Sequence, residues 1–286
     1  MKYFFKICCF LFLSPLFISC VDDSDNHSEI LEAQTLLNVS YGNNSQQVYD
    51  LYLPKGRNTT KTKVILLIHG GGWTSGDKDD MQGFVTFLQL MRPDYAIANV
   101  NYVLANEQNY AFPNQFLDIK SIIQQLTSEK NNLKINPEFG LIGVSAGGHL
   151  ALMYDYAYDI NNQVKFVSNI VGPTDFSDPF YADSQFQDLI LAFIDQSAYP
   201  QGTDFIEELS PVTHVSSGSS PTSMFFGTDD PLVPSGNGVV LSEALSNQGV
   251  YNTLRIYNGG HGGDWSYEDA LDMQQIILNY IDTYLP

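Results

Sequence analysis

The strongest constraint on the fold is a set of short, mostly apolar runs that are rich in β-branched and aromatic residues. They occupy residues 64–68, 95–100, 139–144, 164–171, 223–226 and 253–257. Strands that lack regular polar alternation are buried on both faces, which is typical of a parallel sheet covered by helices. A looser alternation over residues 34–53, interrupted at 41–44, predicts a hairpin before these strands.

Between these runs, apolar residues recur every three to four positions, as they do on one face of a helix. They are Phe116, Ile119, Ile122, Ile123 and Leu126, then Leu241 and Leu245, and finally Ala270, Met273, Ile276, Ile277, Tyr280 and Ile281. Strands alternating with helices predict an α/β fold, with a mostly parallel central sheet and helices on both faces. Residues 176–210 fit neither pattern and are predicted to form a small lid insertion.

Charge and cysteine content exclude several classes of function. The chain has 286 residues and a formal net charge of −19, which disfavours binding to nucleic acid or to anionic lipid. Cys8, Cys9 and Cys20 all lie near the N-terminus, so the remaining residues have no thiol for a disulfide, a zinc site or a nucleophile. No motif indicates a metal or another cofactor.

The N-terminal residues have the pattern of an export signal. Lys2 and Lys6 precede an apolar run over residues 7–18, which is followed by Ser19 and Cys20. The run is shorter than the roughly 20 apolar residues of a membrane span. We expect residues 1–19 to be a signal peptide, 20–35 a polar tether and 36–286 the folded domain.

The residues before Cys20 resemble a bacterial lipobox, although Phe17 stands where leucine is usual. This resemblance implies that Cys20 carries lipid and that lipid alone attaches the protein to a membrane. The expected location is then the bacterial cell envelope, at the outer membrane or the cell surface. Secretion after ordinary signal cleavage is the alternative.

A G-x-S-x-G motif lies between a predicted strand and an apolar helix start. It runs from Gly143 to Gly147 and places Ser145 at its centre. A sharp strand-to-helix turn exposes such a serine to a substrate carbonyl, and the glycines allow the turn. We therefore predict that Ser145 is a nucleophile. Because a helix N-terminus favours developing negative charge, we also predict that the Ala146 N–H stabilises the oxyanion.

A second glycine-rich motif, from His69 to Trp73, directly follows the first buried run. Its glycines leave backbone N–H groups free, and a tetrahedral intermediate of acyl transfer needs such donors. We predict that Gly71 and Gly72 complete the oxyanion hole. The spacing does not fit a phosphate-binding loop. His69 is predicted to organise this loop through a backbone hydrogen bond.

A serine nucleophile needs a base, and the chain has five histidines. His27 lies in the tether, His69 in the glycine loop, His149 on the helix after Ser145, and His214 in a predicted surface loop. His149 is expected to be packed and hydrogen-bonded. His261 lies in a glycine-rich segment between the last strand and the last helix, where it can reach Ser145, so we predict that it is the base.

The carboxylate that orients the base should lie between Ser145 and His261 in the chain. Asp229 and Asp230 follow a buried strand and both are candidates, with Asp230 favoured by its place three residues before Val233.

Taken together, these motifs resemble the α/β-hydrolase esterases over roughly residues 48–286. The resemblance is greatest to carboxylesterases of the hormone-sensitive-lipase kind and to bacterial feruloyl and acetyl-xylan esterases. It implies that Asp230, rather than Asp229, completes the triad. Val103 and Phe226 depart from the arginine and histidine that the family commonly has, and Val103 leaves in doubt any ion pair at its site.

The resemblance implies a serine esterase that forms an acyl-enzyme intermediate without a cofactor. A shallow site suits short acyl groups, or acetyl and feruloyl esters on a polysaccharide. Two alternatives remain. The His-Gly-Gly-x-Trp motif also resembles that of kynurenine formamidases, which cleave an amide. A non-catalytic binding module on the same fold is a further, weaker alternative.

Overall fold

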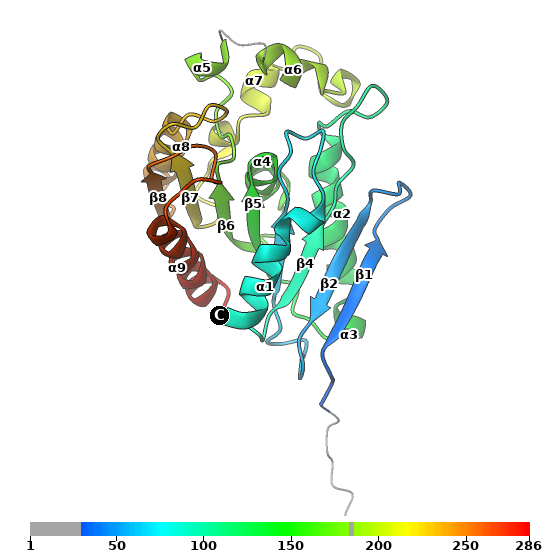
Figure 1. Ribbon diagram of the computed structural model, residues 1–286. Helices are drawn as coiled ribbons and strands as arrows, with labels where there is room; N and C mark the ends of the chain where they lie inside the picture. The colour runs from blue at the N-terminus through cyan, green and yellow to red at the C-terminus, as the bar shows by residue number, and fades with distance from the viewer. Residues whose placement is uncertain (1–29, 183–185) are drawn as a thin grey trace, which may run out of the picture. The chain divides into compact units, whose positions relative to one another are not determined.

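An eight-stranded sheet forms the centre of the unit Leu31–Pro286 in the computed structural model, which describes residues 30–182 and 186–286 (Figure 1). Its strands are β1 (Gln34–Ser40), β2 (Val48–Leu53), β3 (Val64–Ile68), β4 (Ala96–Val100), β5 (Phe139–Val144), β6 (Val164–Ile170), β7 (Thr222–Gly227) and β8 (Asn252–Tyr257). The spatial order is β1-β2-β4-β3-β5-β6-β7-β8. Strands β3 to β8 are parallel, whereas β2 pairs antiparallel with β1 and β4. The predicted mostly parallel sheet is confirmed.

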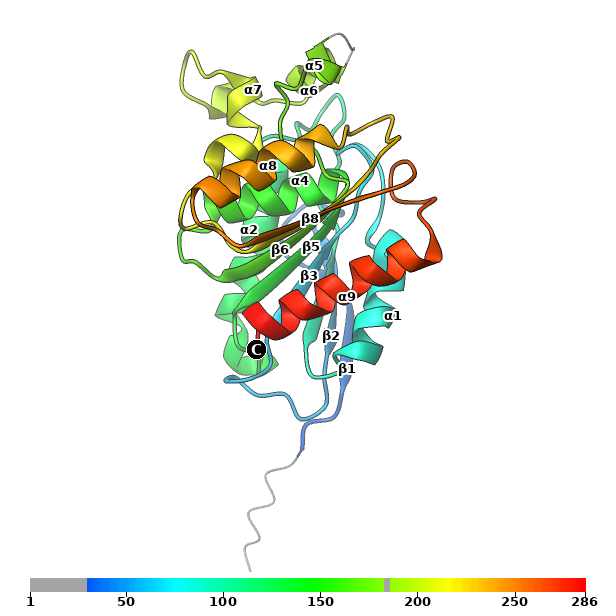
Figure 2. The same cartoon turned by 90° about the vertical axis from the view of Figure 1, so that its left-hand side faces the viewer.

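Helices cover both faces of this sheet. The α-helices of the described residues are α1 (Gln82–Met91), α2 (Asn114–Ser128), α3 (Lys130–Leu133), α4 (Ala146–Met153), α5 (Pro179–Ala182), α6 (Phe186–Ala192), α7 (Phe205–Glu208), α8 (Gly236–Asn247) and α9 (Tyr267–Tyr284). Figure 2 shows α1 and α9 on one side of the sheet and α2, α4 and α8 on the other. Alternate residues of β3 divide between these layers. Leu66 packs in the cluster with Phe116 of α2, and Ile65 in the cluster with Val85 of α1. This two-sided burial explains the apolar strands.

Helix α1 is missing from the sequence-based prediction. Its buried stripe within the helix is narrow, with Val85 and Leu88 as the buried residues.

His214, predicted to lie in a surface loop, instead ends the short helix η4 (Pro211–His214), and its Nε2–H donates to the Glu208 carbonyl over 2.7 Å.

The segment predicted as a lid connects β6 to β7 and contains the short helices α5, α6 and α7. These helices lie beyond the carboxyl ends of the strands (Figure 1). Their function as a lid remains a prediction.

The predicted signal peptide and Cys20 lie outside the described residues. Within the described part of the chain, no helix combines the length and apolar character that crossing a membrane requires.

A buried ion pair fixes the chain between β3 and α1. Lys78 Nζ lies 3.1 Å from Asp50 Oδ2, and both side chains are almost fully buried. The Lys78 N–H donates to Asn101 over 2.6 Å, and its carbonyl accepts from Asn99 over 2.7 Å. Burial by itself lowers the pKa of Lys78, but the hydrogen bond and charge of Asp50 raise it above its usual value. The short helix η1 (Lys78–Met81) is therefore held against the sheet.

We expect Lys78→Met to lower the free energy of unfolding by about 3 kcal/mol, because it leaves the Asp50 carboxylate buried without its cation. Denaturant titration measures the change. The double variant Lys78→Met/Asp50→Asn should recover part of the loss. Lys55→Met is the matched control, since the ion pair of Lys55 with Glu32 is exposed, and its effect should stay below about 1 kcal/mol. Equal losses in the two lysine variants would contradict this account.

Candidate active site

Ser145 occupies a strained turn between β5 and α4. Its φ is +53° and its ψ is −121°, a conformation that a residue with a Cβ rarely adopts and that costs about 1–3 kcal/mol. The Ser145 N–H donates to the Ile170 carbonyl over 2.8 Å, and the Ser145 carbonyl accepts from the His149 N–H over 3.1 Å. The surrounding backbone therefore holds the turn in place.

Two glycines let this turn pack against its neighbours. A Cβ at Gly143 would overlap the backbone of Gly147, and a Cβ at Gly147 would overlap the carbonyls of Ile68 and His69. The turn at Ser145 therefore lies directly against the end of β3 and the start of the glycine loop. These contacts explain the two glycines of the G-x-S-x-G motif.

A row of hydrogen bonds links three predicted site residues from separate loops. His261 Nε2 lies 2.9 Å from Ser145 Oγ, and His261 Nδ1 lies 2.6 Å from Asp230 Oδ2. An ionised carboxylate can only accept hydrogen bonds, so the imidazole proton lies on Nδ1. Nε2 is then free to accept the proton of the Ser145 hydroxyl.

The environment of Asp230 keeps this carboxylate ionised. Its Oδ1 accepts from the N–H groups of Leu232 and Val233 over 2.8 and 3.0 Å. Burial raises the pKa of Asp230, but the hydrogen bonds from His261, Val233 and Leu232 outweigh it and lower the pKa below its usual value. Asp229, in contrast, is exposed, and its carboxylate accepts from the Thr228 hydroxyl over 3.0 Å.

The glycine loop after β3 presents unused N–H groups beside Ser145. No hydrogen bond among the described residues takes up the N–H of Gly71 or Gly72. The N–H of Ala146 is at the first position of α4 and so has no partner within the helix. Gly71 and Gly72 have positive φ values of 111° and 56°. This backbone conformation, which glycine adopts readily, gives the loop its course past Ser145.

Two buried histidines support the loop. His69 Nδ1–H donates to the Gly70 carbonyl over 2.6 Å, and its ring stacks on Tyr102. His149 accepts from Trp73 Nε1 over 3.3 Å through Nδ1, and its Nε2–H donates to the Leu209 carbonyl over 2.8 Å. Complete burial lowers the pKa of His149 to about 4, so it stays neutral. Both histidines are structural supports, as their sequence contexts predict.

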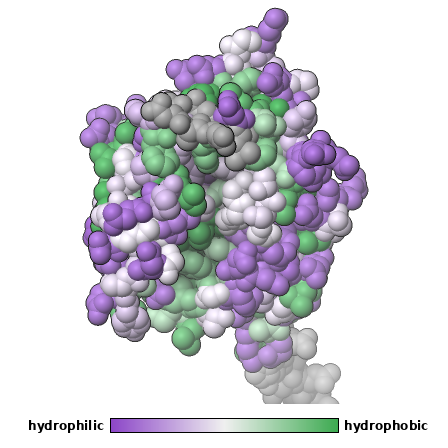
Figure 3. Space-filling model, turned by 45° about the horizontal axis from the view of Figure 1, so that its top comes forward, coloured by the Kyte–Doolittle hydropathy of each residue, from purple (hydrophilic) through white to green (hydrophobic). Residues whose placement is uncertain are grey.

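A cleft of about 560 Å³ brings the glycine loop and the hydrogen-bonded row together. It is lined by Gly70, Gly71, Gly72, Asp80, Met81, Phe84, Val144, Ser145, Leu232 and His261. Figure 3 shows hydrophobic surface, in green, along a hollow in the face that carries the carboxyl ends of the strands. The wall formed by Met81 and Phe84 comes from η1 and α1, and the sequence-based prediction missed it. The periodic spacing of Phe84, Val85 and Leu88 was a weak signal for this helix.

The loop that carries His261 is fastened to its surroundings. Asp264 Oδ1 accepts from the Gly260 N–H over 2.8 Å, and Trp265 Nε1 donates to the Gly260 carbonyl over 3.2 Å. At the end of β7, a Cβ on Gly227 would overlap the carbonyls of Gly260 and Gly259. Gly227, Asp264 and Trp265 thus position His261, although no motif in the sequence identified them.

Comparisons with known proteins identify a family and several relatives. The model of the BD-FAE family matches residues 49–245. Esterase LipC of Mycobacterium tuberculosis is 22% identical over 79% of this chain and 59% of its own length. Kynurenine formamidase of Salmo salar is 33% identical over 46% of this chain and 44% of its own length. The chain thus spans about half the length of these curated relatives.

A solved structure, described as a truncated form of carbohydrate esterase from gut microbiota, shares the fold. Its TM-score is 0.66 and its sequence identity is 22%, over 90% of this chain and 99% of that chain.

We expect Gly227→Ala to lower the rate of the reaction at this site by at least about tenfold, since a displacement of about 1 Å at a catalytic group can cost 100-fold. The added methyl would push the His261 loop away from Ser145. Gly83→Ala is the matched control, because a Cβ there meets no atom within 4 Å. A serine-directed fluorophosphonate measures the reactivity of Ser145 without knowledge of the substrate. Equal labelling rates in the two variants would contradict the proposed positioning by Gly227.

Proposed function

Because the chain belongs to the BD-FAE family, we propose that it is a serine hydrolase that cleaves carboxylic esters. The observation that carries this proposal is the row Ser145–His261–Asp230, with distances of 2.9 and 2.6 Å, beside unused N–H groups of the glycine loop. A nucleophile, a base, an orienting carboxylate and oxyanion donors are the parts that acyl transfer requires.

In the first half of the reaction, Ser145 Oγ attacks the ester carbonyl carbon while its proton moves to His261 Nε2. The carbonyl oxygen gains negative charge and accepts hydrogen bonds from the N–H groups of Gly71, Gly72 and Ala146. Asp230 stabilises the imidazolium without taking its proton. His261 then donates the proton to the leaving alcohol oxygen, and the acyl group stays on Ser145.

In the second half, His261 removes a proton from water, and the hydroxide formed attacks the acyl-enzyme carbonyl. The same N–H groups stabilise the second tetrahedral intermediate. Its collapse releases the carboxylic acid and returns the proton from His261 to Ser145 Oγ. Apart from the ester and water, these steps use side chains and backbone groups of the described residues.

The cleft favours a short acyl group, such as acetyl, or a compact aromatic acyl group, such as feruloyl. Met81, Phe84 and Leu232 give it apolar walls, whereas Asp80 opposes an anionic substrate. The alcohol side of the ester is proposed to be a polysaccharide, which is supported by the likeness to a solved carbohydrate esterase.

Cleavage of an N-formyl amide is the second candidate, and the partial match to a kynurenine formamidase favours it. The same nucleophile and base serve this reaction. A substrate panel of acetyl, butyryl, octanoyl and feruloyl esters together with a formanilide separates the two activities. Preferred cleavage of the formanilide would replace the esterase proposal.

The proposed location is the bacterial cell envelope, with lipid on Cys20 as the attachment. Lys2, Lys6, the apolar residues 7–18 and Ser19 before Cys20 support export and lipidation. The net charge of −19 gives the protein no attraction to anionic headgroups, so lipid is the expected anchor. Secretion without lipid is the alternative.

We expect Ser145→Ala to lower kcat for a nitrophenyl acetate ester by about 10⁴ or more, and Asp230→Asn by about 10³–10⁴, because the latter stabilises the wrong imidazole tautomer. Asp229→Asn is the matched control and should change kcat by less than about tenfold, since its carboxylate does not contact His261. Steady-state kinetics on folded variants, checked by circular dichroism, give these ratios. A larger loss in Asp229→Asn than in Asp230→Asn would mean that the other carboxylate acts.

We expect the full-length protein to incorporate radioactive palmitate in a Gram-negative host and to partition into detergent on phase separation. Cys20→Ser should abolish labelling, because the thiol is the acceptor of the lipid. Cys8→Ser/Cys9→Ser is the matched control, since these thiols precede the proposed cleavage site. Unlabelled wild-type protein in the aqueous phase would favour the secreted alternative.

A further inference from the structure

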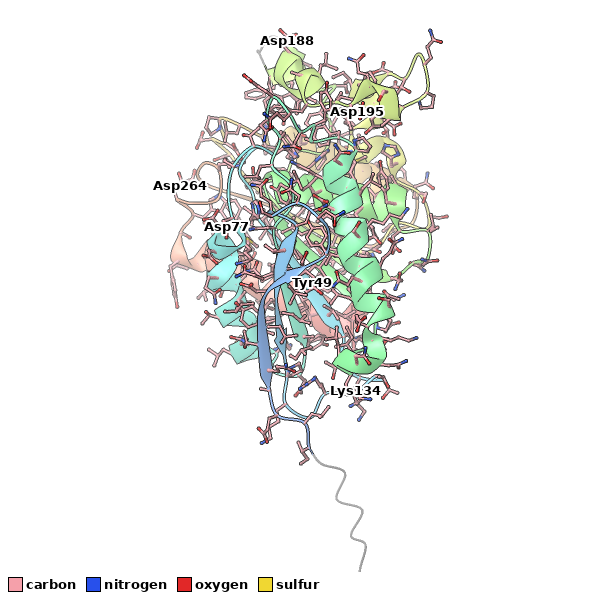
Figure 4. All side chains as sticks on the ribbon, turned by 90° about the vertical axis from the view of Figure 1, so that its right-hand side faces the viewer. Tyr49, Asp77, Lys134, Asp188, Asp195 and Asp264 are labelled. Carbon is pink, nitrogen blue, oxygen red and sulfur yellow. The ribbon has the colours of Figure 1, made fainter. Side chains whose placement is uncertain are left out.

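Two hollows on the surface adjoin each other at one tyrosine. The first has a volume of about 320 Å³ and the second about 710 Å³, and Tyr110 lines both. These volumes lie in the range of ligand pockets. Neither hollow shares a residue with the cleft that contains Ser145. In Figure 4, Asp195 of the second hollow lies well apart from Asp264 of the His261 loop.

Tyr110 is presented on backbone that is held by hydrogen bonds. The residue is 48% exposed. Its carbonyl accepts from Asn114 Nδ2 over 3.1 Å. Nearby, the Phe112 N–H donates to the Phe193 carbonyl over 3.1 Å, and the Asp195 N–H donates to the Phe112 carbonyl over 2.9 Å. An exposed aromatic ring on such a support is a preorganised contact surface, because little freedom is lost on binding.

The first hollow is lined mainly by groups that suit hydroxyl ligands. Its polar side chains are Asn44, Gln47, Asn109, Asn114, Asp118 and Ser121. Amide side chains both donate and accept hydrogen bonds, as hydroxyl groups do. No hydrogen bond within residues 30–182 and 186–286 uses Asn44 Nδ2, Asn109 Oδ1 or Asn114 Oδ1. These atoms remain available to a ligand.

Hydrogen bonds hold the side chain of Asp118, which lines this hollow, in place. Its Oδ1 accepts from Gln47 Nε2 over 2.8 Å, and its Oδ2 accepts from the Val103 N–H over 2.8 Å. Among the described residues, none of the ion pairs includes Asp118. Asp118 is thus a buried carboxyl group whose oxygens are satisfied by hydrogen bonds, without a cationic partner among the described residues.

The charge of the surface limits the ligand further. Among the described residues, neither hollow is lined by lysine or arginine, and the charged side chains at them are Asp118 and Asp195. Polymers that carry carboxylate or phosphate would be repelled. Asp118 is only 5% exposed and already accepts hydrogen bonds, so it offers little to a cation. The remaining class of ligand is neutral, is rich in hydroxyl groups, and has a face that can stack on the ring of Tyr110.

We propose that Tyr110 and the hollows on either side of it bind a neutral polysaccharide chain, at a site separate from the catalytic cleft. One sugar ring lies with its apolar C–H face on Tyr110. The neighbouring units extend into the two hollows, where amide and hydroxyl side chains bond their hydroxyl groups. This site keeps the polymer at the protein independently of the acyl group that the cleft takes.

Affinity gel electrophoresis tests the proposal with the full-length chain carrying Ser145→Ala, so that the result does not depend on esterase activity. The gels contain arabinoxylan, mixed-linkage β-glucan, galactomannan or, as the anionic polymer, polygalacturonate. We expect at least one neutral polymer to retard the protein and polygalacturonate not to do so. Tyr110→Ala should weaken this retardation at least about tenfold in Kd, as expected for loss of an aromatic contact.

Tyr267→Ala is the matched control, because Tyr267 is 74% exposed on α9 and lines neither hollow. It should leave retardation unchanged. The double variant Asn109→Ala/Asn114→Ala should weaken retardation severalfold. It tests the proposal if Tyr110→Ala fails to fold. With Ser145 restored, Tyr110→Ala should hydrolyse nitrophenyl acetate at the wild-type rate.

Three results would overturn the proposal. They are absence of retardation by every neutral polymer, retardation that the hollow variants do not weaken, and stronger retardation by polygalacturonate. Each of these leaves the esterase proposal intact, whereas an inactive wild-type enzyme that is retarded through Tyr110 would contradict only the catalytic proposal.

Discussion

The left-handed backbone of Ser145 is the constraint on which the rest of the site depends. The residue takes φ +53° although it has a Cβ, and such a conformation persists only when its surroundings enforce it. Here the enforcement comes from the end of β6, through the bond from the Ser145 N–H to Ile170, and from the contact of Gly147 with the end of β3. Central parallel strands thus supply the free energy that holds the serine above the sheet.

The same packing connects Ser145 to the groups that are proposed to act with it. His149, one helical turn after Ser145, accepts a hydrogen bond from Trp73 and so ties α4 to the glycine loop. Gly227 brings the end of β7 against the backbone that precedes His261. Because each contact joins elements at the carboxyl edge of the sheet, a small displacement in one strand would move Ser145, His261 and the N–H groups of the glycine loop apart together.

The polar groups of the molecule divide into two kinds of surroundings. Around the cleft, Asp230 and the Lys78–Asp50 pair are buried and satisfied, and they fix the positions of His261 and η1. Around Tyr110, several amide atoms at open hollows have no hydrogen-bond partner among the described residues. The first arrangement would preorganise the proposed reaction, whereas the second leaves hydrogen-bonding capacity for an external molecule. These two arrangements support the two proposed functions, which are catalysis in the cleft and polymer binding at a separate surface.

The sequence alone determined the features that repeat locally. Apolar runs identified the strands, and motifs next to those strands singled out Ser145, the glycine loop and His261, because residues that are adjacent in sequence share one turn. Only the tertiary structure decided the contacts between distant segments. The spacing before Val233 and the family resemblance favoured Asp230 over Asp229, but the contact itself is a feature of the tertiary structure, in which the backbone turns one carboxylate toward His261 and the other toward Thr228. Likewise, Lys78 meets Asp50, and Tyr110 meets the chain near Asp195, through packing that no local periodicity encodes. Such pairs depend on how the sheet brings remote loops to one edge, which is a property of the whole fold.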